Sequence, residues 1–272
     1  MRSVHRATIL FWLIAGAAFV FLLWNAWKTW LANGEPAIVT GYTLLGIMVF
    51  LFAFNTRKKL SMVPLGRAAY WTMAHAVVGS LAIGVFFIHT GGEIWPSGVY
   101  EQVFAVFFYL VSISGILGYW MQRVIPRRLT ENGLEIIWER IPYEVAEIRN
   151  RAEAIVLESA EKTASDTLPR FYAETLAWYF RRPRYLLSHF FGFQSGRAFI
   201  RRETAAISRY LDETERGYLS ELEDLAHIKN RIDFAYAVNG MAKIWLLFHV
   251  PTAVGVLVLM VWHIILVHVY LL

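Results

Sequence analysis

The chain of 272 residues contains no cysteine. This absence excludes thiolate-ligated iron–sulfur clusters and disulfides, and it excludes a covalently attached c-type haem, which needs a C-x-x-C-H motif. Any metal or prosthetic group must therefore be held by other ligands and by packing.

Motifs for nucleotides are also missing. We find no G-x-G-x-x-G fingerprint, no P-loop, no alternating strand pattern and no metal-ligand cluster in the charged segment 122–243. No Asp or Glu lies in the middle of the apolar segments. Histidine–carboxylate pairs and an acidic proton relay inside a membrane are therefore not expected. We expect no nucleic-acid partner.

Apolar residues are abundant and come in blocks. They make up 57% of the chain, and the mean hydropathy is +0.44. Each block is long enough to cross a hydrocarbon core of roughly 30 Å. The first is too long for a typical signal peptide, which favours a retained helix. We predict an all-α integral membrane bundle of five transmembrane helices, over residues 7–31, 37–54, 68–90, 99–121 and 244–272.

Charge is concentrated between the fourth and fifth blocks. Residues 122–243 hold 19 of the 26 basic and 18 of the 21 acidic residues, in long runs rich in Glu, Arg, Ala and Leu. Such runs are typical of helices. We predict a helical soluble insertion over 122–243, between transmembrane helices 1–4 (residues 1–121) and transmembrane helix 5 (residues 244–272).

The remaining charges predict an orientation. Basic residues cluster at the N-terminus and in the 55–67 loop, and they follow the fourth block, whereas the loops at 34–36 and 91–98 carry only acid. By the positive-inside rule, the N-terminus and the insertion are cytoplasmic and the C-terminus lies outside. We expect an energy-conserving membrane, namely a bacterial inner membrane.

One local basic patch stands out in the insertion. A solvated face, or contact with anionic lipid headgroups, is favoured over a docking site for a protein partner. Its members are Arg181, Arg182, Arg184, Arg197, Arg201 and Arg202.

Two apolar segments each carry a pair of histidines fourteen residues apart: His75 with His89, and His249 with His263. Fourteen helical residues rise about 21 Å and turn about 40° short of four full turns. Each pair thus faces nearly one way, and two such helices side by side present two stacked His–His levels. This spacing predicts two b-type haems with paired histidine ligands, an inner haem at His75/His249 and an outer haem at His89/His263.

Other residues fit a flat cofactor. Gly79, four residues after His75, lets a ring approach the backbone, although small residues also mark plain helix packing. The fourth block offers a further close-packing wall at Ser112, Ser114, Gly115 and Gly118. Arg67 and Lys243, at the cytoplasmic ends of the ligand helices, are candidates to pair with haem propionates. Purely structural histidines are the competing interpretation.

His268 is a fifth histidine of these segments. It lies five residues after His263, about 140° around the helix, so it cannot serve the same haem from the same face. A hydrogen bond to a quinone carbonyl or proton exchange at the surface, and an interfacial histidine with no task, are equally favoured. His189 and His227, in the insertion, are interpreted as structural.

The string from His249 to His268 reads His, thirteen residues, His, four residues, His. It resembles a haem-ligand helix of the cytochrome b subunit of quinol:cytochrome c reductases, and the string from His75 to His89 resembles that family's other ligand helix. The resemblance covers roughly fifty residues and rests on the spacing of the histidines. It implies axial ligation by His75, His89, His249 and His263, and it implies a quinone near His268.

The chain departs from that family by its large insertion and by lacking a Pro-Glu-Trp-Tyr quinol-oxidation motif. It is more loosely similar to the membrane domain of ferric reductases and to di-haem cytochrome b anchors of respiratory dehydrogenases. We expect an electron-transfer subunit of an oxidoreductase complex rather than a stand-alone enzyme. Its partners would be membrane lipid, a quinone pool and other redox subunits. The alternative is a non-redox membrane scaffold or sensor.

Overall fold

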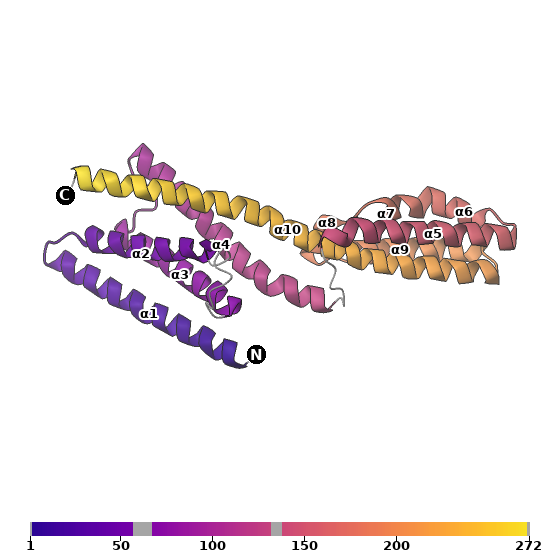
Figure 1. Cartoon of the computed structure of the whole chain (residues 1–272), viewed down its shortest axis with the longest axis horizontal. Coiled ribbons are helices and arrows are strands. Elements are labelled where there is room, and N and C mark those ends of the chain that lie inside the picture. Colours follow the sequence, from indigo (N-terminus) through magenta and orange to yellow (C-terminus); the bar gives the residue numbers. More distant parts are fainter. Residues whose placement is uncertain (1, 57–66, 132–137, 271–272) are drawn as a thin grey trace. The chain divides into compact units, whose positions relative to one another are not determined.

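The computed structural model describes residues 2–56, 67–131 and 138–270. Helices account for every regular element there, and no strand occurs in these ranges, so the all-α prediction is confirmed (Figure 1). Four long helices come first: α1 (Arg2–Leu31), α2 (Pro36–Thr56), α3 (Ala68–His89) and α4 (Val99–Glu131).

Shorter elements follow, and one very long helix closes the chain. They are η1 (Trp138–Arg140), α5 (Ile141–Thr163), α6 (Thr167–Phe171), the π-helical turn η2 (Tyr172–Leu176), α7 (Ala177–Arg181), α8 (Leu186–Phe191), α9 (Ser195–Ile207), η3 (Ser208–Tyr210) and α10 (Glu213–Tyr270).

Within the described ranges, five helices are long and apolar enough to cross a membrane, which confirms that part of the prediction. On α1 the large apolar side chains face outward; Leu13 and Phe21 are 65% and 66% exposed. Such surface is unfavourable in water but is solvated by lipid tails. The five spans are Arg6–Leu31, Pro36–Phe54, Ala68–His89, Val99–Leu129 and Glu213–Tyr270.

The fifth apolar segment is not a helix of its own. α10 begins at Glu213, well before residue 244, and continues through Pro251 to Tyr270 (Figure 1). It starts with a reciprocal cap, in which Glu215 N–H donates to Asp212 Oδ1 (2.7 Å) and Asp212 N–H donates to Glu215 Oε2 (3.1 Å). Hydropathy marks where a helix meets lipid, not where it begins, which is why the sequence pattern placed the start too late.

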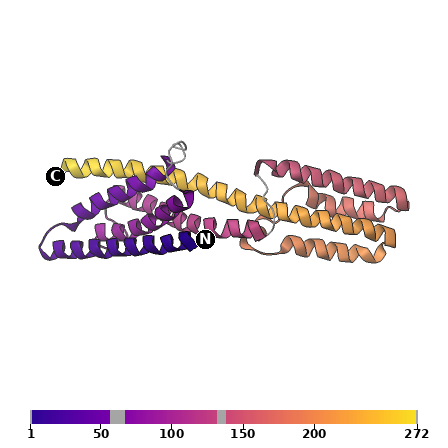
Figure 2. The same cartoon turned by 60° about the horizontal axis from the view of Figure 1, so that its bottom comes forward.

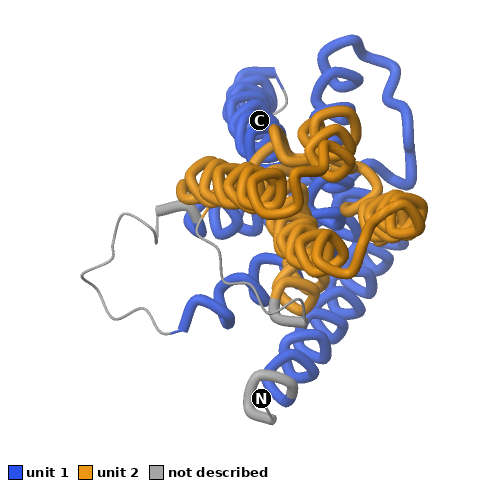
Figure 3. Tube along the Cα trace, turned by 90° about the vertical axis from the view of Figure 1, so that its right-hand side faces the viewer, with its two compact units in different colours: residues 1–120, 245–272 blue, residues 121–244 orange. Residues whose placement is uncertain are grey.

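The chain divides into two compact units (Figure 3). Unit 1 contains residues 1–120 and 245–272, and unit 2 contains residues 121–244. In unit 1, α1, α2 and α3 pack against one another, side by side in both Figure 1 and Figure 2. Glycine allows aromatic rings to sit close to the helix backbone: a Cβ at Gly84 would lie 2.6 Å from Phe19, and one at Gly255 would lie 2.4 Å from Phe107.

Unit 2 has an aromatic and aliphatic core of its own, made by α5, α6, α7, α9 and the first part of α10. Its outer surface carries ion pairs one helical turn apart, such as Arg140–Glu144 and Lys162–Glu158, as is typical of a water-facing helix. The largest fully buried apolar side chains there are Ile141, Leu168, Leu176, Tyr179, Phe180, Ile200, Leu222 and Ile232.

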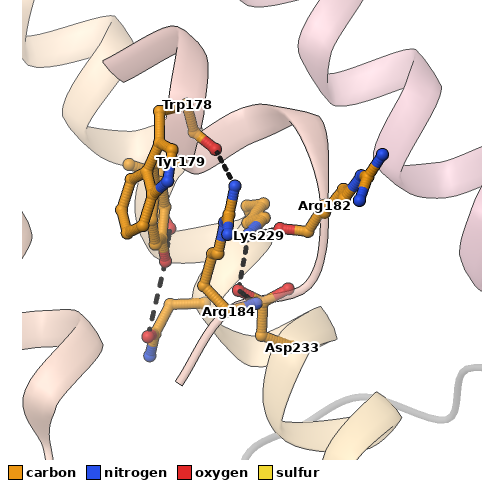
Figure 4. Close-up of polar contacts among 8 residues, drawn as sticks. Trp178, Tyr179, Arg182, Arg184, Lys229 and Asp233 are labelled. Carbon is orange, nitrogen blue, oxygen red and sulfur yellow. Dashed lines mark hydrogen bonds and ion pairs between the residues drawn. The ribbon is translucent and has the colours of Figure 1, made fainter. Parts of the chain in front are cut away.

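A buried ion pair lies inside unit 2 (Figure 4). Lys229 Nζ and Asp233 Oδ2 are 2.6 Å apart, and both side chains are fully inaccessible to solvent. Lys229 also donates to the carbonyl of Arg182 (2.8 Å), and Asp233 Oδ2 accepts the N–H of Arg184 (3.2 Å). The pair therefore holds the turn that leads from α7 into α8.

Substituting one partner should be far worse than substituting both. Lys229→Met leaves Asp233 buried without its cation, which should cost about 3–5 kcal/mol, whereas Lys229→Met with Asp233→Leu should recover most of the loss. Hydrogen exchange of the α10 amides in the full chain measures this. Lys162→Met, which removes an exposed ion pair, is the control and should change protection little. Equal losses in the single and double variants would contradict this account.

Candidate functional site

Four histidines of the apolar segments gather between α3 and α10 in unit 1. α3 supplies His75 and His89, and α10 supplies His249 and His263. The rings of His89 and His263 have centres 6.3 Å apart and are almost perpendicular, at 86°. His75 lies close enough to His249 for the two rings to interact electrostatically. The structure thus brings His89 near His263 and His75 near His249, as the fourteen-residue spacing predicted.

At the outer level, formed by His89 and His263, one ring nitrogen of His89 already makes hydrogen bonds within the protein. His89 Nδ1 lies 3.0 Å from the carbonyl of Ala37 and 3.3 Å from Thr40 Oγ1. A carbonyl only accepts, so Nδ1 carries the proton and donates it, which leaves the lone pair of Nε2 free. His263 lies between aromatic rings, with Tyr100 stacked at 6.4 Å and Phe104 at 5.8 Å.

The inner level repeats this arrangement on α10. His249 Nδ1 lies 2.8 Å from Ser114 Oγ on α4. Ser114 donates its own hydroxyl proton to the carbonyl of Val111 (2.9 Å), so it accepts from His249 Nδ1–H. The Nε2 lone pair of His249 is again free. Trp245 stacks on the His249 ring at 5.2 Å and donates to the carbonyl of Ser114 (2.7 Å).

His75 differs from His89 and His249 in its hydrogen bonding. Its Nδ1 is buried and has no hydrogen-bond partner. The ring makes a backbone hydrogen bond to Leu51 and lies 4.8 Å from the ring of Phe54. A buried ring nitrogen without a partner is unfavourable in an apolar environment, so His75 can still gain from binding a ligand.

His268 differs from these four. Its Nδ1 contacts the carbonyl of Ile264 at 2.8 Å, and its Nε2 contacts the hydroxyl of Tyr42 at 3.0 Å. With both ring nitrogens engaged, His268 has no free lone pair for a metal in this arrangement. A quinone or proton role for His268 stays a prediction, in which Tyr42 would take part.

Gly79, Arg67 and Lys243 are the other residues that the sequence predicted for the haem sites. A Cβ at Gly79 would meet only Leu51 Cδ2, at 4.0 Å, so this glycine faces α2 with room for a methyl group. Arg67 is exposed just before α3. Lys243 is occupied elsewhere, because its Nζ lies 3.6 Å from Glu139 and 4.5 Å from the centre of the Trp138 ring. A propionate would have to compete with Glu139 for Lys243.

Apolar side chains separate the two histidine levels. Ala82 on α3 lies between His75 and His89, and Val256 and Met260 lie between the two histidines of α10; all three are buried. Phe86 on α3 stacks on Phe108 of α4 at 4.2 Å. The two levels are therefore distinct sites with an apolar layer between them.

The described residues include no group of three or more His, Asp or Glu that could hold a bare metal ion. A structural metal ion usually needs four protein ligands. Haem iron takes four nitrogens from its porphyrin and needs only two side chains from the protein. Each histidine level supplies that number of side chains.

Sequence reasoning named Ser114 only as a small residue on a packing face, and it missed Thr40, Tyr42, Tyr100 and Trp245 around the histidines. Hydroxyl groups and the indole N–H in apolar helices were the available signal, because each needs a hydrogen-bond partner there. Comparisons with family models, with curated proteins and with solved structures found no match for this chain.

Gly118 on α4 gives a direct test of this packing. A Cβ there would lie 2.0 Å from Trp245 Cζ2. Gly118→Ala must therefore displace the indole that stacks on His249, and it should cost about 1–3 kcal/mol by overpacking. Thermal unfolding followed by tryptophan fluorescence measures this. The control is Gly46→Ala, whose Cβ meets nothing within 4 Å. Equal behaviour of the two variants would show that the packing is wrong.

Proposed function

We propose that this chain is a membrane electron-transfer subunit that holds two b-type haems, each between one histidine of α3 and one of α10. The observation that carries the proposal is the outer pair. An imidazole nitrogen binds a first-row metal at about 2 Å, which places the centres of two ligating rings roughly 6 Å apart. The rings of His89 and His263 lie 6.3 Å apart.

Hydrogen bonding of the second nitrogens supports the same proposal. Histidine ligands of metals usually donate their other N–H to a carbonyl, a carboxylate or water, which sets the tautomer and the ring orientation. His89 does so toward Ala37, and His249 does so toward Ser114. The buried, unpartnered Nδ1 of His75 would gain a partner or be relieved by rotation of the ring.

When bound, haem supplies reversible one-electron chemistry, and the protein supplies orientation and electrostatic tuning. His75 and His249 would hold the inner group, and His89 and His263 the outer group. Ala82, Val256 and Met260 keep the layer between them apolar. We propose that the electron donor and the electron acceptor both lie outside this chain. We infer that it acts in a respiratory-type complex, with a quinone pool and a partner redox subunit.

We also propose a location in a bacterial inner membrane, with the N-terminus and residues 122–243 on the cytoplasmic side. This placement rests on the charges of the loops. Levels about 21 Å apart along both helices would carry electrons from one membrane face toward the other.

Removal of single histidines tests the haem assignment. His89→Ala should eliminate one of two haems and leave the other, whereas His268→Ala should leave both, because His268 already uses both ring nitrogens. Pyridine-haemochrome analysis of the purified variants gives the haem-to-chain ratio. A His89→Ala protein with an unchanged ratio would contradict the proposal. A folded wild-type chain without haem would favour the scaffold or sensor.

A substitution at Ser114 tests the role of the hydrogen bond that His249 Nδ1 donates. Ser114→Ala removes the acceptor of His249 Nδ1–H, and loss of such a partner typically weakens metal binding about 10–100-fold. We expect faster loss of the inner haem to an apo-globin acceptor, with the outer haem unaffected. Ser112→Ala, on the same helix, is the matched control. Equal rates of haem loss in the two variants would argue against this hydrogen bond.

A further inference from the structure

The short helix α8 (Leu186–Phe191) has an inverted pattern of burial. Its buried side chain is the polar one, His189, at 5% exposure. Leu187 and Phe191 are 67% and 64% exposed, and Phe193, just after the helix, is 67% exposed. A helix that covers a water-facing domain normally buries its apolar side and exposes its polar side. α8 does the reverse.

The buried ring of His189 packs against α10. Its ring meets the edge of the Phe234 ring of α10, with centres 6.2 Å apart. Burial lowers the pKa of His189 to about 4, and the nearby cations of Lys229 and Arg197 act in the same direction. The side chain is therefore neutral at neutral pH and remains inside, so the apolar side of α8 stays outside.

The backbone around α8 is fixed at both ends. Tyr185 (φ 55°) and Gly192 (φ 85°) adopt left-handed conformations that begin and end the helix. Arg128 on α4 donates to the carbonyl of Phe190 (3.0 Å). The preceding turn is held by the buried Lys229–Asp233 pair (Figure 4). The exposed apolar side chains are thus presented by a rigid support.

The position of Arg128 on α4 shows at which point of that helix α8 is attached. Arg128 is the last residue but one of the membrane-length span of α4, Val99–Leu129. Arginine side chains near the end of a membrane helix extend into the headgroup layer. The hydrogen bond to Phe190 therefore ties α8 to the end of α4 that lies near the lipid headgroups.

The chain segment that contains α8 carries only basic charge. Between Arg181 and Arg202 the chain contains six arginines and no Asp or Glu. Arg181, Arg182, Arg197 and Arg201 are exposed. Basic residues interspersed with exposed leucine and phenylalanine are typical of segments that lie in the interface of an anionic membrane.

We propose that the segment Leu186–Phe193 lies in the headgroup layer of the leaflet next to unit 2, with Leu187, Phe191 and Phe193 inserted between lipids and the neighbouring arginines on anionic phosphates. Unit 2 would then contact the membrane surface at this segment. The proposal goes beyond electron transfer and does not depend on haem.

Because the chain contains no cysteine, a spin label attaches only to the single cysteine that is introduced. Spin labels at Leu187→Cys and Phe193→Cys are compared with a label at Leu157→Cys, a leucine of α5 that is 66% exposed. The full chain is placed in nanodiscs that contain phosphatidylglycerol. Oxygen partitions into lipid and a nickel chelate stays in water, so their collision rates report membrane insertion.

We expect the oxygen-to-nickel ratio to be several-fold higher at positions 187 and 193 than at position 157. Equal ratios would overturn the proposal. Low collision with both reagents at 187 and 193 would also overturn it, because that result means a protein surface covers the segment.

A charge variant separates anionic lipid from lipid in general. Arg197→Gln with Arg201→Gln should lower the ratio at position 193, and so should nanodiscs of phosphatidylcholine alone. Arg209→Gln, an exposed arginine outside this segment, should leave the ratio unchanged. A ratio that is high in all these conditions would contradict the pairing of arginines with anionic phosphates. Haem content, measured on the same samples, should be constant throughout.

Discussion

The site in unit 1 depends on one constraint: a polar ring nitrogen inside an apolar helix must find a partner. Each histidine has two nitrogens, and the protein treats them differently along α3 and α10. His89 and His249 each use Nδ1 for a protein hydrogen bond. His268 uses both nitrogens, whereas His75 leaves a buried nitrogen without a partner. This difference in hydrogen bonding distinguishes His268 from the candidate ligands.

Helix geometry places these histidines at two matched levels. Positions fourteen residues apart share a face of a helix, and α3 and α10 each carry one such pair. α4 then completes the inner level by placing Ser114 against His249 and by leaving room for Trp245 at Gly118. A histidine pair, its hydrogen-bond acceptor and a supporting indole thus come from three helices that meet in one unit.

The sequence predicted the helical class and the five membrane-length helices, because hydropathy over long blocks is a strong signal. From spacing alone it also predicted that His89 lies across from His263, and their ring centres are 6.3 Å apart in the structure. It missed that α10 starts at Glu213, because apolar composition does not mark helix ends in water. Partners such as Ala37 for His89 and Tyr42 for His268 depend on how α2 packs, and side-chain periodicity in one helix carries no information on that packing.

The central claim is that paired histidines of α3 and α10 bind haem. Quantifying haem in the purified wild-type chain, together with its reduced-minus-oxidised absorption spectrum, tests this most directly. The account predicts two b-type haems per chain with the spectrum of low-spin iron bound by two imidazoles. A folded chain that binds no haem when haem is supplied during expression would contradict it, and the histidine spacing would then serve packing alone.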